Sequence, residues 1–236
     1  MFEIHKLSLS FGDKELFHID QLKLQVGKSY ALIGPNGSGK SSLIKSILGL
    51  VRETQVDKIL WNKQPISLYD PGECTWMPSQ VNFEIEWSVK DFVLSGLNRF
   101  KKWYEPYSRE DYIQVEKYLK DFELEHLSLR RINSLSDGEK QRSLLAKTFI
   151  SRPHFVLLDE PTSFVDLPHK IRLNRFFKDW ANQSNRLVLY STHDIQFCLN
   201  EVDEVLFLFE GHIHQMLPDD FKRSKILKDW IGNFEL

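Results

Sequence analysis

Apolar residues along the chain form two kinds of segment, which predict two kinds of strand. Alternating apolar and polar residues, separated by turns at Gly12-Asp13 and Val26-Gly27, predict an antiparallel β-subdomain. Its strands are expected at Phe2–Phe11, Leu16–Val26 and Lys58–Asn62. Short continuous apolar runs are typical of strands that are buried on both faces of a parallel sheet. Such runs occupy Ser29–Ile33, Phe155–Leu158 and Arg186–Tyr190.

Helical spacing of apolar residues characterises the segment from about Phe83 to Asn133. Ser108 is the expected N-cap of one helix, and Ser88–Leu97 is expected to form another. The apolar positions of the Ser108-capped helix are Tyr112, Val115, Tyr118, Leu119 and Phe122.

The last part of the chain predicts a hairpin and a helical tail. Glu204–Phe209 and His212–Leu217 are expected to pair through a turn at Glu210-Gly211. After Pro218, the tail Phe221–Leu236 is expected to form one or two helices packed on the surface, and no chemistry is assigned to it.

Residues 34–41 read GPNGSGKS and connect the apolar run that ends at Ile33 to a helical pattern. In such a loop the glycines allow consecutive backbone N–H groups to point at a phosphate, next to the positive end of the helix dipole. Lys40 is expected to reach the β- and γ-phosphates, and the Ser41 hydroxyl to ligate Mg²⁺. The chain is therefore expected to bind a nucleoside triphosphate. The residues assigned to this binding are Gly34, Pro35, Asn36, Gly37, Ser38, Gly39, Lys40, Ser41 and Ser42.

Two adjacent carboxylates, Asp159 and Glu160, end the apolar run at Leu158. A buried strand explains the run but not the charges. Beside a phosphate loop, Asp159 can hold Mg²⁺ and Glu160 can orient or deprotonate the attacking water. The alternative is a strand followed by a solvated acidic turn.

A third motif, Leu135, Ser136, Asp137, Gly138 and Glu139, precedes a helical apolar pattern. Ser136 and Glu139 have the spacing of a capping box, which starts a helix and presents a hydroxyl and backbone N–H groups to an anion. Taken alone, this segment could be only a helix start.

The order of these motifs resembles that of ABC ATPases over nearly the whole chain. The resemblance implies that residues 135–139 are the signature motif, and that His193, at the end of the run Arg186–Tyr190, is the switch histidine that contacts the γ-phosphate. It also implies that Asp166 belongs to the D-loop, which reaches the partner subunit, although Asp166 could equally cap the helix introduced by Pro168, or do both.

The fold implied by the resemblance is α/β, a RecA-like phosphate-loop NTPase core with an antiparallel β-subdomain and an inserted helical subdomain. Residues 1–236 would form a single ABC ATPase domain. Within it, residues 1–70 approximately would hold the β-subdomain and phosphate loop, about 83–133 the helical subdomain, and about 134–236 the remaining core and tail.

Three positions depart from the family pattern. Phe11 stands where the family more often has the tyrosine that stacks on adenine, and it could instead be a core residue. Ser79 stands where the glutamine loop has Gln, with Gln80 one residue later. We predict that a bulge lets Gln80 reach Mg²⁺ and take part in catalysis, and that Ser79 serves only if the bulge is absent. Asp137 replaces a glycine, so its carboxylate is expected to turn away from the phosphate.

Composition limits the remaining possibilities. The chain has 236 residues and a formal net charge of −2, which gives no electrostatic case for nucleic acid. No apolar run approaches the roughly 18 to 20 residues needed to span a bilayer, and no secretion signal is expected. Cys74 and Cys198 lie far apart and are expected to be reduced packing residues in a cytosolic protein.

The resemblance implies a two-chain ATPase that drives transport. Lys40, Ser41 and Asp159 would hold Mg-ATP on one subunit, while Ser136 and Gly138 of a second, identical subunit close on the γ-phosphate. The implied partners are integral-membrane permease subunits and, indirectly, an extracytoplasmic substrate-binding protein. The chain would then be cytoplasmic and peripheral on the inner face of the cell membrane, and Trp103 or Tyr104 are candidates for the permease contact.

The cargo is a weaker part of the resemblance. Residues 159–169, the switch segment and the helical insert look most similar to ATPases of siderophore–iron, haem and cobalamin importers. A lipid or peptide exporter and a soluble scaffold ATPase remain alternatives. A chromosome-maintenance relative would need a long coiled-coil insert between Lys40 and Ser136, which is absent from the sequence.

Overall fold

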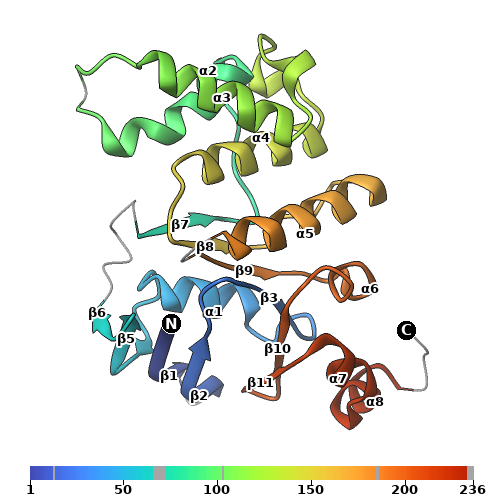
Figure 1. The fold of residues 1–236 in the computed structure, drawn as a ribbon. Helices are drawn as coiled ribbons and strands as arrows, with labels where there is room; N and C mark the ends of the chain where they lie inside the picture. The colour runs from blue at the N-terminus through green and yellow to red at the C-terminus, as the bar shows by residue number, and fades with distance from the viewer. Residues whose placement is uncertain (13, 66–72, 103, 184–185, 233–236) are drawn as a thin grey trace.

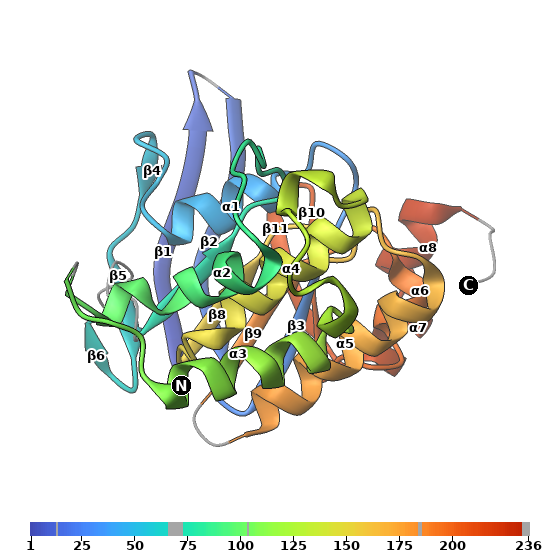
Figure 2. The same ribbon diagram turned by 90° about the horizontal axis from the view of Figure 1, so that it is seen from above.

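The computed structural model describes residues 1–12, 14–65, 73–102, 104–183 and 186–232. Figure 1 shows three layers: a small antiparallel sheet with helix α1, a larger sheet in the middle, and a helical layer at the top of the view. Seen from above, the helices of that layer lie over the strands of the larger sheet (Figure 2).

The larger sheet has the strand order β11-β10-β3-β9-β8-β7. Its strands are β3 (Lys28–Ile33), β7 (Cys74–Met77), β8 (Phe155–Leu158), β9 (Leu187–Ser191), β10 (Glu204–Phe209) and β11 (His212–Met216). All neighbouring pairs are parallel except β10 and β11, which form the predicted hairpin. The carboxyl ends of the parallel strands therefore meet along one edge of the sheet.

Each parallel strand contributes alternate side chains to two separate hydrophobic clusters. In β8, Phe155 and Leu157 join the cluster under α1 and the small sheet, whereas Val156 and Leu158 join the cluster under the helices. Because side chains alternate between the faces of a sheet, a continuous apolar run is what a strand covered on both sides requires. The buried runs predicted from the sequence are confirmed.

The small sheet consists of β1 (Phe2–Phe11), β2 (Lys14–Leu24), β4 (Thr54–Gln55), β5 (Lys58–Trp61) and β6 (Gln64–Pro65). Strand β2 lies two residues earlier than predicted, and its pairing with β1 has a register shift between Leu9 and Ser10. Helix α1 (Lys40–Ile47) packs its buried residues Leu43, Ile44 and Ile47 against this sheet and the larger one.

The helical layer contains α2 (Val89–Leu94), α3 (Arg109–Asp121), α4 (Asp137–Ile150) and α5 (Leu167–Asn182). Ser88 caps α2, and Ser108 forms a capping box with Asp111 at the start of α3, as predicted. The helix expected up to Leu97 ends earlier, and a 3-10 turn at Ser95–Phe100 follows. There Gly96 approaches α4 so closely that a Cβ would come within 2.4 Å of the Lys147 carbonyl oxygen.

The remaining elements are short. They are α6 (Ile195–Cys198), α7 (Pro218–Arg223), α8 (Lys225–Ile231) and 3-10 turns at Glu125–Leu127 and Ile132–Ser134. Cys74 and Cys198 are buried and outside any disulfide bond among the described residues, and burial raises the pKa of Cys198 to about 12. Among the residues that the structure describes, none of the helices has the length and apolar content needed to cross a membrane.

Candidate functional site

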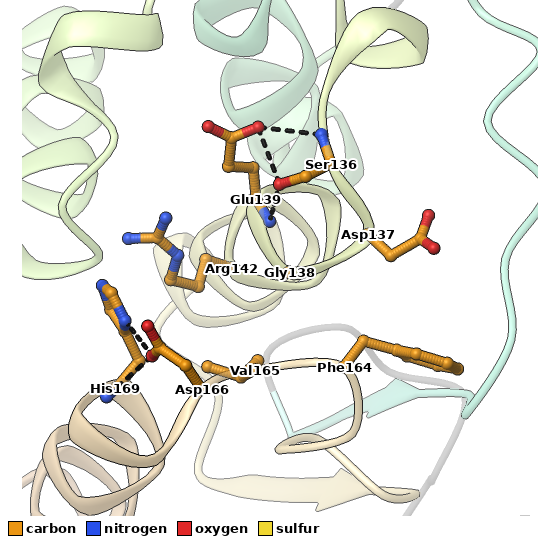
Figure 3. A pocket seen from close by; sticks show the side chains of 9 residues that line it. All are labelled: Ser136, Asp137, Gly138, Glu139, Arg142, Phe164, Val165, Asp166 and His169. Atoms are coloured by element: carbon orange, nitrogen blue, oxygen red, sulfur yellow. Dashed lines mark hydrogen bonds and ion pairs between the residues drawn. The ribbon is translucent and has the colours of Figure 1, made fainter.

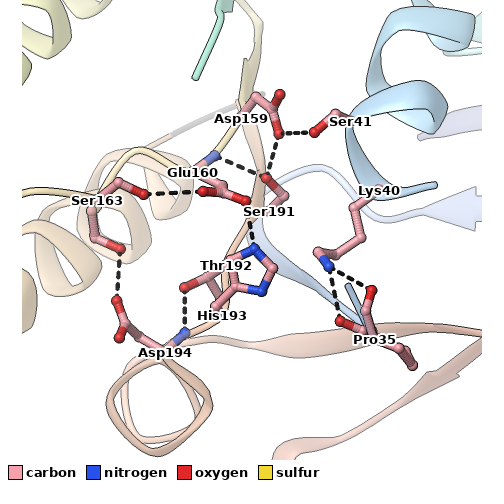
Figure 4. Close-up of polar contacts among 12 residues, drawn as sticks. Pro35, Lys40, Ser41, Asp159, Glu160, Ser163, Ser191, Thr192, His193 and Asp194 are labelled. Atoms are coloured by element: carbon pink, nitrogen blue, oxygen red, sulfur yellow. Dashed lines mark hydrogen bonds and ion pairs between the residues drawn. The ribbon is translucent and has the colours of Figure 1, made fainter. Parts of the chain in front are cut away.

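The site is assembled at the carboxyl ends of three neighbouring strands. The phosphate loop follows β3, Asp159 and Glu160 follow β8, and His193 follows β9 with one residue between. Because these strands are adjacent and parallel, residues more than a hundred positions apart in the sequence lie side by side (Figure 4). The structure thus brings the predicted phosphate loop, carboxylates and switch histidine together.

The phosphate loop is held in a conformation that requires glycine at two positions. Gly39 has a φ of +100°, and a Cβ on Gly34 would lie 2.3 Å from the Leu208 carbonyl oxygen. The first requirement is left-handed backbone and the second is close packing on β10. The Ser38 hydroxyl oxygen is buried and has no partner among the described residues, so the loop keeps a polar atom available for a ligand.

Lys40 lies beneath the loop and is 6% exposed. Its ammonium group donates to the Gly34 carbonyl at 2.8 Å and to the Pro35 carbonyl at 3.0 Å. Burial lowers the pKa of Lys40, and the nearby carboxylates of Glu160 and Asp159 act in the opposite direction. A buried cation beside anion-binding N–H groups is the electrostatic environment that a polyphosphate requires.

Asp159 connects the phosphate loop to the two strand ends. Ser41 Oγ donates to Asp159 Oδ1 at 2.9 Å, and Ser191 Oγ donates to the same oxygen at 2.7 Å. The Glu160 backbone N–H in turn donates to Ser191 Oγ at 2.8 Å. The sequence analysis assigned no role to Ser191. The feature that could have indicated one is its position as a polar residue directly after an apolar run. Ser191 fixes the relative position of both carboxylates.

Glu160 is placed between two polar side chains (Figure 4). One carboxylate oxygen lies 2.5 Å from His193 Nε2, and Ser163 Oγ donates to the other at 3.2 Å. The backbone of Glu160 has a φ of 52°, which is unusual for a residue with a side chain. The His193 side chain remains 45% exposed, so this pair faces solvent rather than the core.

Helix α4 is tied to the carboxylate segment by a residue that the sequence reasoning missed. Gln141, which is buried, donates through Nε2 to the Glu160 and Pro161 carbonyls, both at 3.2 Å. The available signal was its position directly after the signature motif. The side chain gives the signature helix a fixed contact with the strand end that carries Glu160.

The signature segment begins α4 as predicted. Ser136 is the N-cap, its Oγ donates to Glu139 Oε2 at 2.8 Å, and the Ser136 N–H donates to the same carboxylate at 2.8 Å. These hydrogen bonds lower the pKa of Glu139. The Asp137 side chain is 74% exposed, pairs with Lys140 at 3.6 Å and points away from Ser136 in Figure 3.

A cavity of about 370 Å³ lies between the signature segment and the expected D-loop (Figure 3). Asp166 on its far side is the N-cap of α5 and accepts a hydrogen bond from the His169 N–H at 3.3 Å. A Cβ on Gly138 would lie 2.9 Å from the Phe164 carbonyl oxygen, so the two segments are in close contact. No residue of the phosphate loop is among the described residues that line this cavity.

The structure bears differently on two of the departures from the family pattern, Phe11 and the pair Ser79 and Gln80. Phe11 is 52% exposed, so the reading of this side chain as a core residue is wrong and its ring face is available for stacking. Strand β7 pairs with β8 in continuous register from Cys74 to Met77, and residues 78–80 follow the end of this pairing. Ser79 is half-buried and Gln80 exposed, and both line a cavity with Asp137. The choice between Ser79 and Gln80 stays a prediction.

Residues 17–163 match the family model described as ABC transporter. The chain belongs to the ABC transporter ATP-binding proteins. The resemblance seen in the sequence and the α/β fold expected from it are therefore confirmed. An ABC transporter ATP-binding protein binds ATP and is an ATPase.

Several relatives have a named cargo. The chain is 27% identical over 216 residues to the petrobactin import ATP-binding protein FpuC of Bacillus anthracis, with 90% of this chain and 79% of the relative covered. It is 31% identical over 208 residues to the high-affinity zinc uptake system ATP-binding protein ZnuC of Bacillus subtilis, with 85% and 88% covered.

Among solved structures, one similar chain comes from a transporter described as of metal-chelate type, in an inward-facing conformation. The TM-score is 0.76 at 26% identity, and 93% of this chain and 84% of the other are covered.

Proposed function

We propose that this ATP-binding protein powers the import of an iron complex, either a siderophore or haem, or of cobalamin. The observation that carries its catalytic part is the Glu160 carboxylate held 2.5 Å from His193 at the end of β8. A carboxylate fixed in this way can orient or deprotonate the water that attacks the γ-phosphate. His193 would sense the γ-phosphate and hold Glu160 in place.

The phosphates of ATP would lie on the loop at residues 34–41. Lys40, now bonded to two loop carbonyls, would turn its charge to the β- and γ-phosphates. The exposed ring of Phe11 would stack on adenine. These contacts bind and orient the substrate, whereas Glu160 and His193 act at the bond that breaks.

Ser41 and Asp159 fit a magnesium ion. Their oxygen atoms lie 2.9 Å apart at the end of the phosphate loop, and hydroxyl and carboxylate oxygens are ligands that Mg²⁺ prefers. Bound there, Mg²⁺ would neutralise charge on the β- and γ-phosphates. Gln80 or Ser79 would supply a further contact to the ion.

A second, identical subunit would complete the site. The signature segment and Asp166 face a cavity away from the phosphate loop, with the N-terminal end of α4 open to an anion. In the dimer, Ser136 and Gly138 of one subunit would close on the γ-phosphate held by the other. Closure would then move the attached membrane subunits.

The membrane partners would be permease subunits, supplied with cargo by an extracytoplasmic binding protein. The chain would sit at the inner face of the cell membrane through the permease. Tyr104, which is 63% exposed, is the candidate contact on the helical layer. The other candidate, Trp103, lies outside the described residues.

Zinc is the second candidate cargo. ZnuC of Bacillus subtilis is as similar to this chain as the siderophore relatives are, and it serves zinc uptake. The ATPase does not touch the cargo, so the cargo assignment rests on the relatives rather than on the site. Iron complexes are favoured by FpuC and by the metal-chelate type of the similar solved chain.

The experiment combines purification with uptake. Tagged Glu160→Gln in the native host, extracted gently from membranes with ATP present, is expected to bring down a polytopic permease as an ATP-bound complex. Cells lacking the protein should then lose uptake of radioactive iron chelate or cobalamin and keep that of zinc. Loss of zinc uptake alone would favour the second cargo. Recovery only with soluble partners would contradict the transport function and favour a scaffold ATPase, and loss of efflux an exporter.

A further inference from the structure

His169 has a position that the ATP site does not explain. It lies in the first turn of α5, three residues after the N-cap Asp166. Its backbone N–H donates to Asp166 Oδ1, and its ring Nδ1 contacts the same oxygen. Capping needs only the backbone contact, so the ring contact is additional. Figure 3 shows the ring and the carboxylate facing each other at the edge of the cavity.

The second ring nitrogen of His169 reaches a different part of the chain. Nε2 lies 3.4 Å from Glu123 Oε2, in the segment that follows α3. Glu123 is held by two further cations: Arg142 of α4 donates to its carbonyl at 3.3 Å, and Arg172 of α5 pairs with its carboxylate. Its φ of 56° is left-handed, a conformation that is uncommon for a residue with a side chain. His169 therefore joins Asp166 to the segment that follows α3.

Both carboxylates can receive a hydrogen bond only from a charged ring. A neutral imidazole has one N–H, whereas the imidazolium has two. The charges around the ring are the carboxylates of Asp166 and Glu123, the guanidinium groups of Arg142 and Arg172, and Glu139 across the cavity. The contact with His169 is the largest cause of the lowered pKa of Asp166, and that of Glu123 is lowered first by Arg172.

We propose that His169 is a positioning residue of the ATPase: as an imidazolium it clamps Asp166 to Glu123, and so holds the D-loop in register with the signature helix. The proposal rests on the proposed function, in which Asp166 meets a second subunit. With the clamp closed, movement of the Glu123 segment is transmitted through the His169 ring to the Asp166 carboxylate. With the clamp open, Asp166 still caps α5, but its carboxylate has lost this link to Glu123.

The variants His169→Asn and His169→Gln separate the two contacts. The Asn amide can replace Nδ1 towards Asp166, and the longer Gln amide can replace Nε2 towards Glu123, but neither reaches both. Each is expected to lower kcat about fivefold, the size of one lost partly exposed charge pair, with KM for ATP unchanged. His18→Asn is the matched control, since His18 also lies between two carboxylates, Glu15 and Asp20, but on β2.

A variant of the second partner distinguishes a clamp from a packing role of His169. Glu123→Gln removes one carboxylate and leaves the His169 side chain unchanged, and it should reproduce the lower kcat with KM for ATP unchanged. Combined with His169→Asn it should lower kcat no further.

Two results would overturn the clamp. One is a wild-type kcat in both His169→Asn and Glu123→Gln, and the other is a change in KM with kcat unaffected. Glu160→Gln, measured in parallel, tests the proposed function separately. If it loses turnover while the His169 variants do not, only the clamp is wrong. If it turns over at the wild-type rate, the catalytic assignment itself fails.

Discussion

The two functional faces of this molecule are built differently. The face at the ends of β3, β8 and β9 has a buried base, formed by Lys40, Asp159 and Ser191, and its side chains are bonded to one another across strands. The face formed by the starts of α4 and α5 is exposed, and its side chains bond mainly within their own first turns. Sheet edges thus fix groups that must act together, whereas helix starts leave N–H groups free for a ligand brought from outside. The comparison explains why one face would need a second subunit.

Glu160→Gln is the strongest test of the difference between the two faces. Removal of the charge leaves the shape of the site, so ATP binding should persist while hydrolysis falls about 100- to 10,000-fold, the range of a lost general base. Single-turnover hydrolysis and equilibrium ATP binding measure the two effects. Glu210→Gln, at the hairpin turn, is the control and should be neutral. Hydrolysis at the wild-type rate would assign water activation to another group.

Lys40→Ala should affect the same face at the binding step. Loss of a charged donor to the phosphates should weaken ATP binding by about 10- to 100-fold. The protein should remain folded, because the lysine now bonds only to loop carbonyls. Fluorescent ATP titration with thermal unfolding as the folding control checks this. Unchanged affinity would mean that the phosphates lie elsewhere.

Ser136→Ala tests the exposed face. It should leave ATP binding by the single subunit unchanged, yet slow steady-state hydrolysis about tenfold, because in the proposed dimer this hydroxyl would contact the γ-phosphate only after closure. Loss of the N-cap should also cost about 1 kcal/mol of unfolding free energy. Ser108→Ala, at the equivalent cap of α3, carries the same stability cost without the kinetic one. Equal hydrolysis rates in the two variants would argue against a role for Ser136.

The smallest effect is expected from Gln80→Ala, which should slow ATP turnover about threefold and leave nucleotide binding largely intact. Ser79→Ala is the matched variant one residue earlier. Steady-state kinetics at varied Mg²⁺ concentration compares them. If only Ser79→Ala slows turnover, the glutamine-loop role belongs to Ser79.

The sequence predicts one face better than the other for a physical reason. Buried parallel strands are visible in the sequence as continuous apolar runs. Because the carboxyl ends of such strands meet at one edge of the sheet, the runs alone predict that Asp159, Glu160 and His193 lie close together. The capping box of Ser136 and Glu139 can also be predicted from the sequence, since the two residues are only three positions apart.

What the sequence does not reveal depends on contacts between elements. Ser191 and Gln141 each contact a segment that is distant in the sequence. These segments are adjacent because of the strand order and the helix packing, which the spacing of residues in the sequence does not show. Tyr112 has helical spacing but is exposed, because it packs on Tyr107 outside the core. The contact between His169 and Glu123 could not be predicted for the same reason.

The left-handed backbone of Glu160 has a consequence for how this protein can change. That conformation costs an ordinary residue about 1 to 2 kcal/mol, and glycine would adopt it freely. A glycine at position 160 would thus be expected to raise the resistance of the protein to heat and to remove the carboxylate that hydrolysis is proposed to need. A population selected only for survival at high temperature would be expected to keep the fold and lose the reaction at this position first.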